Sequence, residues 1–273
     1  MTTKPPPRIL SIAGSDSGGG AGIQADIKTI TMLGGYAMTA ITAITAQNSR
    51  GVQAIAPLGD DMVVEQIDSC LTDFGADAIK IGMLQNAQIV AGVAEGLATL
   101  PEAKGLPIVL DPVMVATSGA RLLEEDAIAT MRDKLFPMAT ILTPNMPELE
   151  ILSGSKLTDT DKTIAAAVKI ASAHGCHVLA KGGHTDDDRV IDILVGPQGF
   201  LMQFDDAKID TPHTHGTGCT LSAAIATLIG HGQHIQHAVR LARQFTRSAI
   251  AYAPGFGDRN GPLGHQAVRK LEG

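Results

Sequence analysis

Short apolar segments rich in β-branched residues alternate with longer segments of helical periodicity along most of the chain. In the segment 62–72, for example, Val63, Ile67 and Leu71 recur every four residues and predict one core-facing helical stripe. The same reading predicts strands at 8–13, 37–45, 52–56, 78–82, 108–111, 140–143, 177–181, 190–195 and 200–204. It predicts helices at 23–33, 62–72, 88–100, 124–135, 147–152, 160–174, 221–230 and 235–252.

Strands that alternate with helices of this length are typical of βαβ units, so we expect an α/β fold with a mostly parallel central sheet covered by helices on both faces. The segment 37–56 differs, because threonines are spread among its apolar residues and no helix separates its two strands. We expect it to form a small β element that stands off the main sheet. No long linker or repeat is visible, so residues 1–273 are predicted to form a single domain, of which residues 1–7 are a flexible tail.

Composition narrows the function classes. With 44% hydrophobic and 18% charged residues, the 273-residue chain can bury a sizeable core. A formal net charge of -7, an aromatic content of 3% and the absence of Trp argue against a nucleic-acid partner, which needs a basic footprint or stacking rings. Three widely spaced cysteines, an N-terminus without an apolar signal segment and the lack of a sufficiently apolar run predict a cytoplasmic protein with no membrane partner.

Polar and glycine residues follow the predicted strands, at the edge where α/β sheets bind their ligands. The segment His215–Thr220 stands directly before an apolar helix, so Gly216 and Gly218 can bring backbone N–H groups close to an anion. The alternative is an ordinary glycine-rich helix start with a threonine cap. Cys219 would lie in the first helical turn, where a lowered pKa would make it a base or nucleophile; the alternative is a small buried residue.

The glycine-rich loop 14–22 matches neither common nucleotide-binding motif. It lacks the Lys-Ser/Thr pair of a Walker A loop, and Ile23 occupies the third glycine position of the dinucleotide pattern. The loop therefore indicates only a close backbone approach to a ligand. Asp26, on the helix that follows, would either cap that helix or face the crevice.

Asp111 ends one predicted strand, Glu148 lies in a first helical turn after another, and Lys181 ends a third. Together they could bind a triphosphate and Mg²⁺, which prefers one or two carboxylates plus phosphate oxygens. The alternatives are a turn aspartate and an N-terminal capping glutamate, both of which are common.

Taken together, the motifs resemble those of the hydroxymethylpyrimidine/phosphomethylpyrimidine kinases of thiamine biosynthesis, a family of the ribokinase superfamily. The resemblance spans nearly the whole chain. The matching segments are Ser11–Asp26 (SIAGSDSGGGAGIQAD), Ala40–Asn48 (AITAITAQN), Ile81–Leu84 (IGML), Asp111–Met114 (DPVM), Thr143–Glu148 (TPNMPE), Lys181–His184 (KGGH) and Thr214–Thr220 (THGTGCT).

This resemblance implies a ribokinase-like kinase, in most cases a homodimer, that uses ATP and Mg²⁺. The implied reaction phosphorylates 4-amino-5-hydroxymethyl-2-methylpyrimidine and then its monophosphate, giving the pyrophosphate. The pyrimidine would be bound by Gly14, Asp26, Gln47, Met83, Val113 and Cys219. The catalytic residues would be Cys219, Gly216, Gly218 and Lys181. The nucleotide would be bound by Lys181, Thr217, Asn145 and Glu148, and Mg²⁺ by Asp111 and Glu148.

Three other functions stay open at this point. A pyridoxal or pyridoxine kinase with the same cysteine would use the same phosphate site for a larger ring. A Cys–His hydrolase could use Cys219 and His215, and would need a third group to orient the histidine. A non-catalytic module would bind the pyrimidine without consuming ATP.

Overall fold

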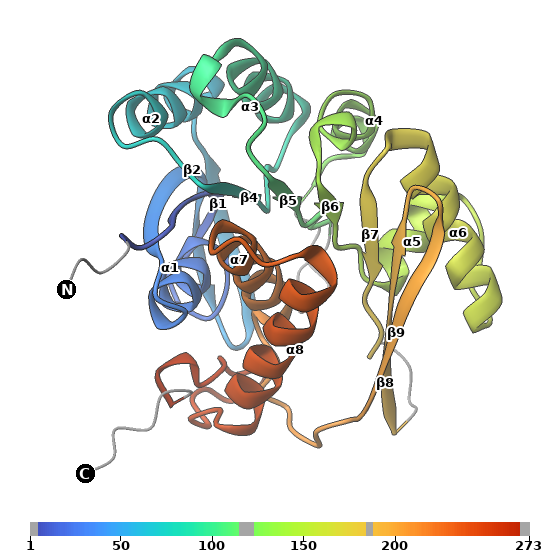
Figure 1. Ribbon diagram of the computed structural model, residues 1–273. Helices are drawn as coiled ribbons and strands as arrows, with labels where there is room; N and C mark the ends of the chain where they lie inside the picture. The colour runs from blue at the N-terminus through green and yellow to red at the C-terminus, as the bar shows by residue number, and fades with distance from the viewer. Residues whose placement is uncertain (1–4, 115–122, 184–187, 268–273) are drawn as a thin grey trace.

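The computed structural model describes residues 5–114, 123–183 and 188–267 (Figure 1). The strands are β1 Arg8–Asp16, β2 Tyr36–Asn48, β3 Gly51–Pro57, β4 Ala78–Ile81, β5 Ile108–Leu110, β6 Ile141–Leu142, β7 His177–Ala180, β8 Arg189–Gly196 and β9 Gly199–Ala207. The helices are α1 Gly22–Met32, α2 Asp60–Asp73, α3 Ala87–Thr99, α4 Glu125–Lys134, α5 Met146–Ser153, α6 Thr160–His174, α7 Thr217–Gly230 and α8 Ile235–Ala251. Short 3-10 turns occupy Pro101–Ala103, Phe136–Met138 and His265–Ala267.

All described strands belong to one sheet, in the order β3-β2-β1-β4-β5-β6-β7-β8-β9. The six strands from β2 to β7 in this order pair in parallel, whereas β3, β8 and β9 are added antiparallel at the two edges. The mostly parallel α/β sheet predicted from the sequence is therefore confirmed, and the expected strands agree with the observed ones apart from their ends.

The prediction for residues 37–56 needs a correction, because β2 is a full member of the central sheet. It pairs with β1 from Arg8↔Tyr36 to Asp16↔Thr45, and only its second half continues into the antiparallel hairpin with β3. The threonines do not prevent this. The buried hydroxyls of Thr42 and Thr45 donate hydrogen bonds to main-chain carbonyls, at 2.7 and 2.8 Å, so their burial carries little cost.

Helices cover both faces of the sheet, and each face has its own apolar core (Figure 1). One face packs against α2, α3, α4, α5 and α6, and the other against α1, α7 and α8. The stripe predicted in α2 is present, since Val63, Ile67 and Leu71 are at most 1% exposed. Burying one side chain of this kind contributes about 1.5–3 kcal/mol, so these layers fix the strand ends in place.

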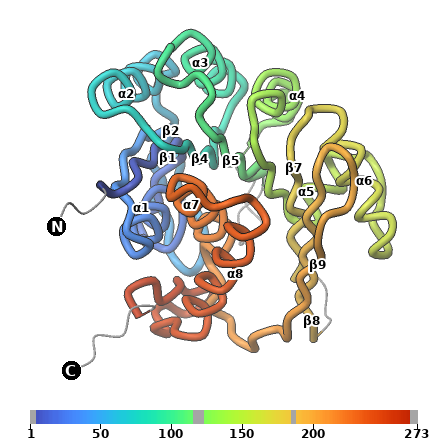
Figure 2. Tube along the Cα trace, in the orientation of Figure 1, coloured from blue at the N-terminus to red at the C-terminus, as the bar shows by residue number. Residues whose placement is uncertain are grey.

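The C-terminal segment returns to the side of the molecule where α1 lies (Figure 2). Gly261 accepts a hydrogen bond from the His215 N–H at 3.1 Å, and His265 Nε2 lies 2.8 Å from Thr220 Oγ1. The last described residues thus pack against the start of α7.

Of the expected tail, residues 1–4 lie outside the described part of the chain. Pro7 is buried and its carbonyl accepts a hydrogen bond from the Tyr36 N–H at 2.8 Å, so packing begins at Pro7. Among the described helices, none combines the length and the apolar character that a membrane crossing requires.

Candidate active site

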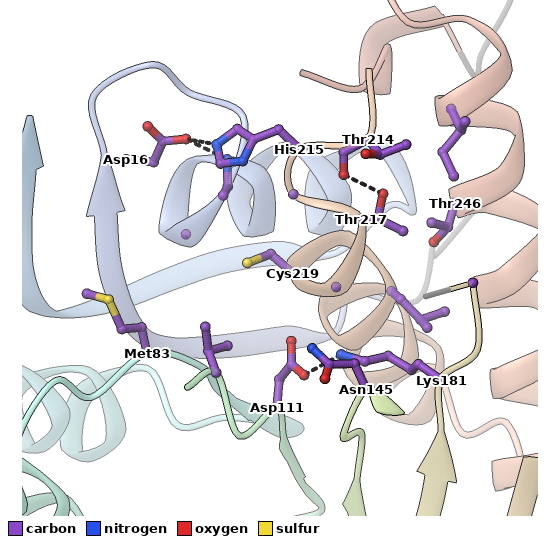
Figure 3. A pocket seen from close by; sticks show the side chains of 18 of the residues that line it. Asp16, Met83, Asp111, Asn145, Lys181, Thr214, His215, Thr217, Cys219 and Thr246 are labelled. Atoms are coloured by element: carbon purple, nitrogen blue, oxygen red, sulfur yellow. Dashed lines mark hydrogen bonds and ion pairs between the residues drawn. The ribbon is translucent and has the colours of Figure 1, made fainter. Parts of the chain in front are cut away.

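A cavity of about 370 Å³ opens at the carboxyl ends of the parallel strands, where the sequence placed the candidate site (Figure 3). Segments that follow β1, β4, β5, β6 and β7 line it together with the start of α7. Of the predicted site residues, these line the cavity: Gly14, Gln47, Met83, Asp111, Val113, Asn145, Glu148, Lys181, Gly216, Thr217, Gly218 and Cys219. His184 lies outside the described residues.

One end of the cavity is apolar. Met83 packs with Ala43 and Val113 in a small separate cluster. A Cβ at Gly14 would lie 2.2 Å from the Met83 Cε, so a larger residue at position 14 would displace the methionine. This end can hold a flat ring between an aliphatic and a thioether surface, with Gln47 at its edge.

Asp26 does not take the position expected of it. Its side chain is fully buried, forms an ion pair with Lys80 at 2.7 Å and accepts a hydrogen bond from Ser11 at 2.6 Å. Among the described residues that line the cavity, Lys80 is present and Asp26 is not. The structure thus places Asp26 behind Lys80 rather than on the cavity wall, and the contact of Asp26 with a ring stays a prediction. A signal existed in the sequence, since Lys80 is the charged residue of the otherwise apolar strand 78–81.

The other end of the cavity is polar, and Asp111 is at its centre. This carboxylate is 1% exposed, pairs with Lys181 Nζ at 2.7 Å and accepts a hydrogen bond from the Thr143 hydroxyl at 2.9 Å. The pairing follows from topology, because β5, β6 and β7 are neighbouring parallel strands that deliver these residues to one edge. Lys181 Nζ places a positive charge at this end of the cavity, of the kind that binds phosphate groups in proteins.

Glu148 lies beside this pair, at the start of α5. With Asn145 it forms a capping box: Asn145 Oδ1 accepts from the Glu148 N–H at 2.9 Å, and Glu148 Oε2 accepts from the Asn145 N–H at 2.8 Å. Burial raises the pKa of the Glu148 carboxyl to about 7; Lys181 opposes this shift and Asp111 adds to it. The capping alternative is thus correct for Glu148, although its carboxyl also lines the cavity.

Asp111 and Glu148 suit a magnesium ion that is carried by a nucleotide. Both offer hard carboxylate oxygens, and their mutual repulsion in a buried site would be relieved by a cation. Within the described residues, no group of three or more His, Cys, Asp or Glu side chains is placed to hold a metal ion. Mg²⁺ needs no such group, because phosphate oxygens and water complete its shell.

The N-terminus of α7 faces the cavity, and the helix begins at Thr217 rather than at the predicted residue 221. Gly216 precedes it in a left-handed conformation with φ of 87°, and within the described chain no side chain caps this helix start. Two features require glycine at position 216: its left-handed φ, and the fact that a Cβ there would lie 1.8 Å from the Gly20 carbonyl oxygen. A Cβ on Gly218 would lie 3.2 Å from Lys181 Nζ and 3.3 Å from Asp111 Oδ2. The helix start therefore adjoins the charged pair, which favours an anion between them.

Cys219 lies in the first turn of α7, and Figure 3 shows it between the apolar and the polar ends. The expected lowering of its pKa is wrong. Burial raises the pKa of the Cys219 thiol to about 11, and the neighbouring Lys80 charge and the Gly22 N–H oppose the shift without overcoming it. In the free protein at neutral pH this residue is a thiol, so desolvation outweighs the helix terminus here.

Two further contacts position the site and were missed in the sequence. Asp16 lies inside the glycine-rich loop, and its Oδ2 atom accepts a hydrogen bond from His215 Nε2 at 2.9 Å. Asp192 accepts a hydrogen bond from the Gly182 N–H at 2.7 Å and pairs with Arg243 of α8 at 2.6 Å, which ties the loop after Lys181 to that helix. No local motif marks Asp192 or Arg243, because they meet only through the tertiary fold.

An apolar end, an uncapped helix start and a buried lysine–carboxylate set are the features expected of a phosphotransferase that acts on a small molecule. Comparison with known proteins agrees. The sequence model of the family Phosphomethylpyrimidine kinase matches residues 16–264. The chain belongs to this family, and the predicted ribokinase-like fold and kinase class are confirmed.

Several relatives are similar over nearly their full length. The hydroxymethylpyrimidine/phosphomethylpyrimidine kinase of Bacillus subtilis is 41% identical over 263 residues, covering 96% of each chain. The phosphomethylpyrimidine kinase structure from Clostridium difficile has a TM-score of 0.77 at 38% identity and covers 89% of this chain and 99% of its own. The pyridoxal kinase of Staphylococcus aureus, in complex with AMP-PCP and pyridoxal, has a TM-score of 0.86 at 34% identity, covering 98% and 96%. These findings favour the kinase over the hydrolase and the non-catalytic module.

Proposed function

We propose that the protein phosphorylates 4-amino-5-hydroxymethyl-2-methylpyrimidine with ATP, and then phosphorylates the resulting monophosphate to the pyrophosphate, as a step of thiamine biosynthesis. The observation that carries this proposal is one cavity that joins an apolar end, edged by Gln47, to the uncapped start of α7 beside Lys181. The names of the relatives support the choice of substrate.

The pyrimidine ring would lie between Met83 and Val113 with Gly14 beneath it, and the Gln47 amide would meet its amino edge. A primary carboxamide has a donor and an acceptor side by side, which complement an exocyclic amino group next to a ring nitrogen. In this arrangement the hydroxymethyl group points toward Cys219 and the start of α7.

The phosphates would lie at the polar end. Gly216 and Gly218 supply the N–H groups for the transferring phosphoryl group, and Lys181 neutralises its charge. The nucleotide would be bound by Thr217, Asn145, Glu148 and Lys181. Mg²⁺, held by Asp111 and Glu148, would supply charge neutralisation at the phosphate oxygens.

In the first transfer the hydroxymethyl oxygen bonds to the γ-phosphorus, the bond from that phosphorus to the ADP oxygen breaks, and the hydroxyl proton leaves. Cys219, in its thiolate form, would accept that proton. In the second transfer the acceptor is a phosphate oxygen that is already ionised, so no such base is needed. The chain's residues then contribute positioning and charge alone.

A pyridoxal kinase is the second candidate, because the pyridoxal kinase of Staphylococcus aureus superposes on almost the whole chain. Pyridoxal carries no amino group beside a ring nitrogen, so the amide of Gln47 would be poorly matched to it. The proposal therefore places pyridoxal below the pyrimidine in kcat/KM.

These assignments are tested by measuring the ATP that the purified protein consumes with the pyrimidine alcohol, its monophosphate or pyridoxal as substrate, each with and without Mg²⁺. We expect turnover of the alcohol and of the monophosphate that requires Mg²⁺. A higher kcat/KM for pyridoxal than for the pyrimidine alcohol would replace the first candidate by the second.

The proposal extends to organisation. Residues 1–273 would act as a single kinase domain, in a homodimer and in the cytoplasm, where the three described cysteines, all of them free, would stay reduced. Support for the dimer comes from the family resemblance. Sedimentation equilibrium at micromolar protein would give twice the chain mass of 28.3 kDa for a dimer.

A further inference from the structure

Strands β7 and β8 separate directly before Lys181, at one end of the cavity. Their antiparallel pairing ends at Ala180↔Ile193, and Lys181 instead forms a parallel bridge with Asn145, which follows β6. The first half of β8, residues 189–192, pairs with β9 on its other side. The chain that follows Lys181 therefore leaves the sheet at the wall of the cavity, which Gly182 and Gly183 line.

The side chain of Asp192 spans the gap between the separated strands. Its Oδ1 atom accepts a hydrogen bond from the Gly182 N–H at 2.7 Å, and its Oδ2 atom pairs with Arg243 Nε of α8 at 2.6 Å. Both charged side chains are only 8% exposed. Charge-assisted hydrogen bonds with a buried partner are strong and directional. The Asp192 carboxylate therefore has a fixed orientation, with one oxygen toward α8 and the other toward Gly182.

Arg243 is held in turn by two contacts with β9. Its guanidinium pairs with Asp206 Oδ2 at 2.6 Å, and its Cζ atom lies 4.8 Å from the centre of the Phe204 ring. A planar guanidinium can bind two carboxylates and stack on a ring at the same time, which a lysine cannot do. Helix α8 and strand β9 thus fix the position of Asp192, and Asp192 fixes the course of the chain at Gly182.

Gly182 passes very close to the main chain of β8. A Cβ at this position would lie 2.1 Å from the Ile191 carbonyl oxygen and 2.9 Å from the Ile191 nitrogen, so a side chain does not fit there. Because the hydrogen bond to Asp192 draws the chain against β8, the chain stays clear of the space beside Lys181. That space belongs to the cavity, which Lys181 also lines.

We propose that Asp192 and Arg243 are positioning residues for the nucleotide, which hold the chain at Gly182 against β8 and so keep the cavity open beside Lys181. This inference rests on the proposed function in one respect, namely that the nucleotide phosphates bind at Lys181. A chain released from β8 would enter the space of the nucleotide and would have to be ordered again when the nucleotide binds. In Figure 3, Lys181 lies on the side of the cavity away from Met83, so the pyrimidine should not be affected.

Two double variants isolate the hydrogen bond to Gly182. Arg243→Met with Asp192→Asn removes both charges and keeps an acceptor for the Gly182 N–H, whereas Arg243→Met with Asp192→Leu removes the acceptor as well. Neither leaves one buried charge without the other. We expect KM for ATP to be about tenfold higher in the Leu variant than in the Asn variant, the effect of one lost hydrogen bond. KM for the pyrimidine alcohol should differ by less than about twofold. Arg189→Met, which breaks an exposed ion pair with Asp205 between the same two strands, is the control and should leave both KM values unchanged.

Gly182→Ala displaces the same stretch of chain without touching the ion pair. Its Cβ cannot be accommodated against Ile191, so the chain should move toward the cavity and KM for ATP should again rise about tenfold. The control is Gly96→Ala in α3, where the new Cβ would meet Val64 atoms at ordinary distances of 3.5 and 3.7 Å and both KM values should stay as they are.

Equal KM values for ATP in the two double variants would overturn the proposal, because the acceptor for Gly182 would then have no effect on the nucleotide. A parallel rise in KM for ATP and for the pyrimidine alcohol would show a merely structural role and overturn it as well. If the double variants do not fold, Gly182→Ala decides: an unchanged KM for ATP would refute the positioning role.

Binding of AMP-PCP with Mg²⁺, measured by calorimetry without any pyrimidine, separates the inference from the function on which it rests. We expect the Asn double variant to bind AMP-PCP about tenfold more tightly than the Leu double variant. This result, together with no pyrimidine turnover in the unmodified protein, would reject the proposed substrate and support the positioning role. Pyrimidine turnover together with equal AMP-PCP affinities in the two variants would support the proposed function and overturn the inference.

Discussion

Glu148 carries a pH dependence that can be worked out from its surroundings, and Glu148→Gln is the perturbation that exposes it. Burial holds the pKa of this carboxyl at about 7 in the folded protein, against an ordinary value of 4.5. A folded-state pKa above the unfolded one means that the folded chain binds more protons between these values. The unfolding free energy therefore falls as pH rises through this window.

The magnitude follows from the two values. One pKa unit is worth 1.36 kcal/mol, so full ionisation of Glu148 costs the fold about 3 kcal/mol, of which roughly 2–3 kcal/mol develops between pH 5 and pH 8. Other groups titrate in the same range, and for that reason the informative quantity is the difference between Glu148→Gln and the unmodified chain. Glutamine keeps the volume, and its one oxygen can accept from either the Asn145 or the Met114 N–H, which in Glu148 bond to different oxygens; the loss of the other bond is the same at every pH and cancels in the comparison across pH.

Urea unfolding curves at pH 5, 6, 7 and 8 measure this difference. We expect Glu148→Gln to gain about 2–3 kcal/mol relative to the unmodified chain from pH 5 to pH 8. Saturating Mg²⁺ and a non-hydrolysable ATP analogue should reduce the gain, because a bound cation favours the carboxylate. If the difference in unfolding free energy between the two chains changes by less than about 0.5 kcal/mol from pH 5 to pH 8, after allowance for the usual extrapolation error, the assignment of a raised pKa to Glu148 is refuted.

Three further substitutions test other parts of the site. Cys219→Ala should depress the rate of the first phosphorylation far more than that of the second. In the unmodified protein the first rate should rise roughly tenfold per pH unit below the Cys219 pKa of about 11, and Cys219→Ala should abolish this rise. Equal losses in the two steps, measured separately, would reject Cys219 as the base. Gly216→Ala should lower the free energy of unfolding, measured in urea, by at least about 2 kcal/mol, because the new Cβ would lie 1.8 Å from a carbonyl oxygen. The control is Gly232→Ala, which has the same φ of 87° but no atom within 4 Å of the new Cβ and should lower it by only about 1 kcal/mol. Lys80→Met should destabilise by about 3–5 kcal/mol by leaving a buried charge unpaired, and adding Asp26→Asn should recover most of that; an unchanged midpoint for Lys80→Met would contradict the buried ion pair.

The alternation of strands and helices was predictable because the sequence pattern that indicates each element lies within the element itself. Val63, Ile67 and Leu71 mark the buried stripe of α2 whatever the helix packs against, and the glycines at 216 and 218 mark a close approach of backbone to a ligand. Strand ends were sufficient to place the cavity, since parallel strands bring their carboxyl ends to one edge. In each of these cases the physical requirement is contained in a few neighbouring residues.

The errors arose where the outcome depends on partners far along the chain. The buried state of Asp26 is set by Lys80, 54 residues away, and the pKa of Cys219 by the protein packed around the start of α7. The position of β2 in the sheet likewise depends on its pairing with β1. Periodicity describes one segment at a time and carries no information about these distant neighbours.

The joining of residues 261–265 to the start of α7 has a consequence for how the enzyme matures. The Gly261 carbonyl accepts a hydrogen bond from the His215 N–H and His265 lies against Thr220, so the turn at the start of α7 is supported by residues that are synthesised after every described strand of the sheet. A ribosome-bound chain that stops short of residue 261 could already have formed the whole sheet and yet leave this turn unsupported. Catalytic competence should consequently appear only once residues 261–265 have been added, after the sheet is already protected from proteolysis.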